Sequence, residues 1–134
     1  MEKEVKELYL AAKDVIKNSY SPYSNFKVAC AILMNDGNVI KGVNVENASY
    51  GLANCAERTA MFTAYTNGYK ASDFKKLLIL SEKDYFIYPC GACRQVMVEL
   101  INQNTEVIIS TTDGKFQHLT INDLMPYSFS NEDL

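Results

Sequence analysis

Three cysteines in two short stretches restrict most strongly what this chain can fold into. Cys55 opens the stretch Cys55-Ala56-Glu57-Arg58, and Cys90 and Cys93 lie further along in Pro89-Cys90-Gly91-Ala92-Cys93. The connection between the two stretches is long enough for a helix, a turn and a strand that bring them back together. Zn²⁺ prefers thiolate and imidazole ligands in tetrahedral geometry, and an open fourth position marks a catalytic site. The sequence therefore predicts three thiolates around one zinc ion, with the fourth position left for water.

Glu57 is the candidate catalytic residue of this centre. It lies two residues after the first ligand, so its carboxylate can sit beside the metal without coordinating it. From there it can take a proton from water and deliver it elsewhere. Cys90 and Cys93 are separated by two residues, which lets the first turn of a helix present both sulfurs to one ion. Helix N-terminal N–H groups and the helix dipole also favour thiolates at that place.

Two other interpretations of the cysteines are weaker. A lone C-x-x-C pair is often a redox motif or half of a structural zinc site. A redox pair does not account for Cys55 and Glu57. A closed four-cysteine site would need Cys30, which lies inside the apolar run 26–34 and has no partner at ligand spacing. We therefore expect Cys30 in the core and a catalytic centre elsewhere.

The composition is that of an ordinary globular protein. The chain has 134 residues, 48% hydrophobic and 22% charged, which predicts one domain over residues 1–134. No apolar run approaches the roughly 20 residues of a membrane span. The charged first residues indicate no signal peptide, and metal-type cysteines predict a reducing, cytoplasmic setting. A net charge of −3 without a long basic run argues against nucleic acid as a partner.

The apolar pattern predicts helices alternating with strands. An i, i+3, i+4, i+7 stripe indicates a first helix, and Asn35-Asp36-Gly37-Asn38 is typical of a hairpin turn. A short continuous apolar run at 77–80 indicates a strand buried on both faces. The expected order is helix 3–18, strands 26–34 and 39–45, helix 56–65, strand 77–80, a helix opened by Cys90, strands 106–110 and 116–119, and helix 121–125. This order predicts an α/β fold with a mixed five-stranded sheet between helices, a three-layer α/β/α domain.

The pattern C-x-E…P-C-x-x-C is typical of zinc-dependent deaminases of nucleobases. Beyond it, four stretches closely resemble the small, homotetrameric cytidine deaminases, and the resemblance extends from about residue 4 to 126: Ser21-Pro22-Tyr23-Ser24-Asn25-Phe26-Lys27-Val28, Gly42 to Gly51, Cys55 to Ala60, and Pro89 to Gln95. The resemblance implies hydrolysis of cytidine and deoxycytidine to uridine and deoxyuridine plus ammonia, for pyrimidine salvage. It also implies one zinc ion per subunit and a homotetramer with shared active sites.

The resemblance assigns roles to individual residues. It makes the three cysteines the zinc ligands and Glu57 the proton shuttle. Asn44 and Glu46 match residues that hydrogen-bond the ribose hydroxyl. Phe26 matches the residue that packs on the cytosine ring, and Ala56 the residue whose backbone contacts it.

Two further aromatic residues match positions that reach a neighbouring subunit's site, namely Tyr50 and Phe129. Phe129 is followed by Ser130-Asn131 where the family commonly has Gly-Pro, and Ala29-Cys30 replaces the usual Gly-Ala. Three thiolates leave a bound Zn²⁺ with a net charge of −1, so positive compensation is needed. Two helix N-termini and Arg58 could provide it, and Gln95 is a further candidate donor to a thiolate.

Other interpretations remain open at this point. The chain could be a related deaminase acting on a nucleotide or on a nucleoside-like antibiotic, or a zinc-stabilised binding module without catalysis. Without the family match, Asn44 and Glu46 would be solvated residues at a strand end. Phe26 would belong to the core and Arg58 to the surface. His118, the single histidine, is predicted to be structural.

Overall fold

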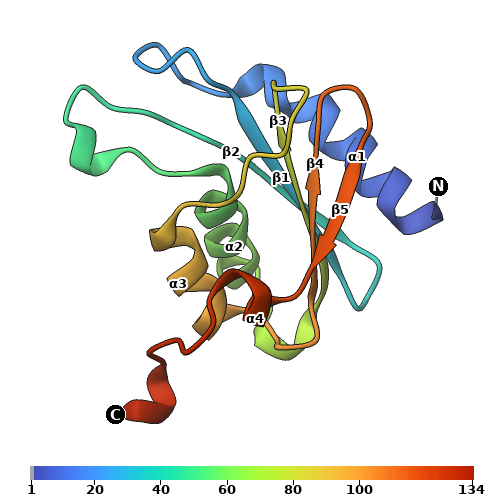
Figure 1. Ribbon diagram of the computed structural model, residues 1–134, viewed down its shortest axis with the longest axis vertical. Helices are drawn as coiled ribbons and strands as arrows, with labels where there is room; N and C mark the ends of the chain where they lie inside the picture. The colour runs from blue at the N-terminus through green and yellow to red at the C-terminus, as the bar shows by residue number, and fades with distance from the viewer. Residues whose placement is uncertain (1) are drawn as a thin grey trace.

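A mixed sheet of five strands forms the middle layer of the molecule in the computed structural model, which describes residues 2–134 (Figure 1). The sheet order is β2-β1-β3-β4-β5. The strands are β1 (Val28–Met34), β2 (Val39–Val43), β3 (Phe74–Ser81), β4 (Glu106–Ser110) and β5 (Phe116–Leu119). β3 and β4 are parallel, and the other neighbours are antiparallel. The predicted five-stranded mixed sheet is confirmed.

Helices cover both faces of this sheet, which confirms the three-layer prediction (Figure 1). α1 (Lys3–Val15) packs on one face. α2 (Ala56–Thr66), α3 (Gly91–Leu100) and the short α4 (Ile121–Leu124) pack on the other. Alternate residues of a strand point to opposite faces, so strands between two helical layers are apolar at every position.

β1 shows this alternation clearly. Its residues divide between the α2/α3 side (Cys30, Ile32, Met34) and the α1 side (Ala29, Ala31, Leu33). Cys30 is fully buried in the first of these clusters, as predicted, and the Ala29-Cys30 pair is accommodated in the core. The predicted strand at 77–80 is the central part of β3.

The ends of the elements differ slightly from expectation. β1 begins at Val28 rather than at residue 26, because the Lys27 N–H is donated to the Glu82 carboxylate instead of to a strand. β2 ends at Val43, and Val45 pairs with Asn54 in an isolated bridge.

No helix among residues 2–134 is both long enough and apolar enough to cross a lipid bilayer.

Candidate metal centre and substrate cavity

The three predicted ligand sulfurs meet where two helices begin. Cys55 is the N-cap residue of α2, Cys90 is the N-cap residue of α3, and Cys93 lies in the first turn of α3. The three Sγ atoms all lie within 4.8 Å of one another, and the Cys55 and Cys90 sulfurs are 3.7 Å apart. Tetrahedral zinc with Zn–S bonds of about 2.3 Å places two sulfurs about 3.8 Å apart. The donor set therefore fits one zinc ion.

Arg58 supplies positive charge directly to this cluster. Its Nη2 donates to the Cys55 sulfur at 3.4 Å, and its Nε is buried with no hydrogen-bond partner in the described part of the chain. Hydrogen bonding from the Cys93 thiol, followed by that from Arg58, lowers the pKa of Cys55 to about 5. The same interaction with Cys55, together with burial, raises the pKa of Cys93. The negative charge therefore rests most easily on Cys55, the sulfur that Arg58 contacts.

Cys30 takes no part in the centre. Within residues 2–134, the three cysteines 55, 90 and 93 form the one group of potential ligands close enough to share an ion. Cys30 is fully buried in the core, and burial raises its pKa well above the ordinary value. The cluster thus has three protein ligands, and the interpretation as a closed four-cysteine zinc site is excluded.

Glu57 is buried beside the sulfurs. It is the second residue of α2 and its side chain is 4% exposed. Burial raises the pKa of Glu57 to about 7, and the negative charge of Cys55 acts in the same direction. Interactions with its own backbone, with Cys93 and with Arg58 oppose that rise. A carboxylate in this place can hold a proton without leaving the cluster.

A cavity of about 280 Å³ opens beside the cluster. Its walls include Glu57, the two ligands Cys55 and Cys90, and all but two of the predicted substrate contacts, namely Phe26, Asn44, Glu46 and Ala56. Ser24, Ile87 and Tyr88 also line it and were not singled out from the sequence. Ser24 lies in one of the four family-like stretches, whereas nothing in the sequence distinguishes Ile87 or Tyr88.

Asn44 holds the strand end to the preceding loop. Its Oδ1 accepts hydrogen bonds from the Val28 N–H at 2.9 Å and from the Ser19 hydroxyl, and its Nδ2 donates to the Phe26 carbonyl at 2.8 Å. These contacts contradict the interpretation of Asn44 as a solvated edge residue. The amide keeps one N–H for another acceptor.

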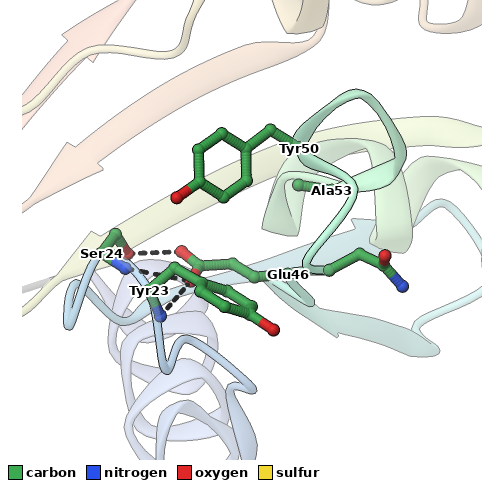
Figure 2. Close-up of a pocket in the computed structure, with 6 residues that line it drawn as sticks. Tyr23, Ser24, Glu46, Tyr50 and Ala53 are labelled. Carbon is green, nitrogen blue, oxygen red and sulfur yellow. Dashed lines mark hydrogen bonds between the residues drawn. The ribbon is translucent and has the colours of Figure 1, made fainter.

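Glu46 lies between the first cavity and a second one of about 320 Å³, which Tyr50 also lines (Figure 2). Its carboxylate accepts hydrogen bonds from the Tyr23 and Ser24 N–H groups and from the Ser24 hydroxyl. The Ser24 hydroxyl is the main cause that lowers the pKa of Glu46. Tyr50 is 76% exposed and meets the Tyr23 ring edge to face, with centroids 6.0 Å apart.

Phe129 and Gln95 line neither of these two cavities. Phe129 is 60% exposed near the end of the chain. Gln95 donates its amide N–H to the Phe129 carbonyl at 2.7 Å instead of to a thiolate. His118 pairs with Glu106 on the last two strands, away from the sulfurs.

Comparison with known proteins agrees with this geometry. The family model described as the cytidine and deoxycytidylate deaminase zinc-binding region matches residues 2–111. A cytidine deaminase of Halalkalibacterium halodurans is 47% identical over 118 residues, covering 88% of each chain. The crystal structure of cytidine deaminase from Burkholderia pseudomallei has a TM-score of 0.89 and 46% identity, covering 96% of this chain and 100% of that one. That of the Mycobacterium tuberculosis enzyme has a TM-score of 0.81 and 30% identity, covering 96% and 99%. The chain belongs to the zinc-dependent cytidine deaminase family.

Proposed function

We propose that this protein hydrolyses cytidine and deoxycytidine to uridine and deoxyuridine plus ammonia, as a cytoplasmic enzyme of pyrimidine salvage. The observation that carries the proposal is the position of Glu57, buried against three converging sulfurs in a cavity that Phe26, Asn44 and Glu46 also line. Relatives named cytidine deaminase support the choice of substrate. The free thiols of the cluster suit a reducing compartment.

Glu57 moves the protons of the reaction. A zinc ion held by the three thiolates would supply Lewis acidity that lowers the pKa of a water molecule. Glu57 accepts the proton that this water loses on attacking C4 of the cytosine ring, and it protonates N3. It later takes the second proton of the former water from the hydroxyl now on C4 and delivers it to the amine, so that the C4–N bond breaks, ammonia leaves and the carbonyl of uracil forms. Arg58 and the first turns of α2 and α3 offset the negative charge of the sulfurs throughout.

The remaining walls of the cavity hold the nucleoside. The Phe26 ring packs against the base, the Ala56 backbone contacts the base edge, and Asn44 and Glu46 bind the sugar hydroxyls. The carboxylate of Glu46 accepts a hydrogen bond from a hydroxyl and repels a nearby phosphate. This favours a free nucleoside over a nucleotide.

Neighbouring subunits complete the site in a homotetramer. Tyr50, Leu52 and Phe129 are 76%, 71% and 60% exposed, so they do not fill the core of their own chain. A partner subunit that covers them would exclude water from the cavity and strengthen its electrostatics. Light scattering combined with activity across a dilution series tests the assembly. A fully active monomer would contradict it.

The function itself is tested by incubating the zinc-loaded protein separately with cytidine, deoxycytidine, deoxycytidine monophosphate and cytosine. Loss of absorbance and release of ammonia are followed together. We expect turnover of both nucleosides and little of the nucleotide or the free base. Equal kcat/KM for deoxycytidine and its monophosphate would favour a nucleotide deaminase. Zinc-loaded protein that turns over none of the four would instead indicate a zinc-stabilised binding module.

A further inference from the structure

The hydroxyl of Ser24 touches both halves of the proposed substrate site. It donates a hydrogen bond to Oε2 of Glu46, on the sugar side. It also accepts a hydrogen bond from the Phe26 N–H at 3.1 Å, on the base side. Ser24 itself lines both cavities that share Glu46, and Figure 2 shows it beside Glu46 in the second of them.

The loop that carries Ser24 is shaped for this contact. The Asn25 N–H donates to the Ser21 carbonyl at 2.9 Å, which closes a turn around Pro22. Asn25 has a φ of 53°, in the left-handed region that asparagine adopts more readily than most residues. The turn aims the Tyr23 and Ser24 N–H groups at one oxygen of Glu46, at 3.0 and 3.1 Å.

Three donors on one carboxylate restrict what else it can bind. A carboxylate has about four acceptor positions, and hydrogen bonds from Tyr23 N–H, Ser24 N–H and the Ser24 hydroxyl occupy three of them. These donors fix the orientation of Glu46 and leave it one acceptor position for a ligand. A carboxylate held in this way recognises a single hydroxyl group.

We propose that Ser24 is a positioning residue that sets recognition of one sugar hydroxyl by orienting Glu46 while fixing the backbone at Phe26. The inference rests on the proposed function, because it concerns the nucleoside bound in the same cavity. Ser24 acts through Glu46 and Phe26 and does not itself need to touch the reacting atoms.

The test compares Ser24→Ala, Ser24→Thr and Ser24→Val as zinc-loaded proteins. The Thr and Val variants have nearly the same shape and differ by a hydroxyl against a methyl group, so this pair decides the question even if Ser24→Ala folds poorly. Ser72→Ala is the matched control, because the Ser72 side chain makes no hydrogen bond within residues 2–134 and lies in the short turn Ala71–Asp73 before β3. For each variant kcat and KM are measured with cytidine, 2′-deoxycytidine and 3′-deoxycytidine.

We expect Ser24→Ala and Ser24→Val to lose about tenfold in kcat/KM for cytidine, chiefly through KM, as for loss of a hydrogen bond to a charged group. For the deoxycytidine that lacks the hydroxyl bound by Glu46, the same variants should lose much less kcat/KM. The ratio of kcat/KM for cytidine to that for this deoxycytidine should therefore fall. Ser24→Thr and Ser72→Ala should keep the wild-type ratio. In a Glu46→Gln background, Ser24→Ala should add little.

The two proposals fail in different ways. A wild-type protein that does not turn over cytidine contradicts the proposed function. A wild-type protein that is active, while Ser24→Val equals Ser24→Thr in its preference among the three nucleosides, overturns the role of Ser24. Equal losses for all three nucleosides in Ser24→Val would likewise assign Ser24 to loop stability alone and overturn the inference.

Discussion

Gly42 of β2 and Ala60 of α2 are in direct backbone contact. A Cβ atom at Gly42 would lie 2.5 Å from the Ala60 nitrogen and 2.8 Å from the Ala56 carbonyl oxygen. These distances are shorter than any side-chain carbon tolerates, so only glycine allows the helix to lie this close to the strand. Because Cys55 caps α2 and Glu57 lies in its first turn, this contact sets where the centre sits relative to the sheet.

Gly42→Ala is therefore expected to destabilise the protein, since either β2 or α2 must move. We expect a loss of about 1–3 kcal/mol in the free energy of unfolding, as for overpacking of a core. Denaturant unfolding of the zinc-loaded protein measures it. Gly51→Ala is the control, because no atom of residues 2–134 beyond its chain neighbours lies within 4 Å of the added carbon. Equal stability of the two variants would show that the contact is not restrictive.

Glu57→Gln should leave the fold and the zinc content intact while removing the proton shuttle. The amide has nearly the same shape as the carboxyl group, and the three ligands are unchanged. We expect kcat for cytidine to fall by about 10²–10⁴-fold. Metal analysis and steady-state kinetics on the same preparation check both statements. Glu7→Gln, an exposed position on α1, should behave as wild type. Near-normal turnover by Glu57→Gln would mean that another group moves the protons.

Arg58→Ala should leave the negative charge of the sulfurs without its nearest compensation, because the guanidinium contacts the Cys55 sulfur at 3.4 Å. We expect lower activity in the zinc-loaded variant. Replacing a thiolate by a neutral imidazole in the same background, as in Arg58→Ala with Cys90→His, should restore part of that activity. An unchanged deficit in the double variant would indicate that Arg58 acts through packing.

Periodicity and ligand spacing made the fold and the metal centre predictable. The apolar runs of β1, β3 and β4 are consequences of burial between two helical layers, so they are visible in the sequence. Two residues between Cys90 and Cys93 restrict them to one helical turn. Contacts that depend on loop conformation were not predictable in this way. The hydrogen bond from the Ser24 hydroxyl to Glu46 requires the turn at 21–25. The Gln95 amide donates to the Phe129 carbonyl, and the conformation of the C-terminal segment that carries Phe129 follows no periodic sequence pattern.

Arg94 connects the start of α3 to the end of α4. Its Nε donates to the Pro89 carbonyl at 2.7 Å, directly before Cys90, and its Nη1 donates to the Leu124 carbonyl at 2.9 Å. Both are hydrogen bonds from a charged donor, each worth about 1.5–3 kcal/mol. Arg94 directly follows the ligand Cys93 in the sequence. Its guanidinium therefore fixes the backbone turn that carries the other ligand of α3, Cys90.

Arg94→Ala should loosen that turn and speed the release of zinc, because the bound geometry of Cys90 would no longer be held. We expect about a tenfold faster transfer of zinc to a coloured chelator, a change that corresponds to about 1.4 kcal/mol. Arg94→Lys should give an intermediate rate, since one ammonium group cannot reach both carbonyls as a planar guanidinium does. Lys17→Ala, in the short 3-10 turn Ile16–Asn18 that follows α1, removes a positive charge without touching α3 or α4 and should leave the rate unchanged. If Arg94→Ala releases zinc as slowly as that control, the Cys90 turn is held by the metal and its ligands alone.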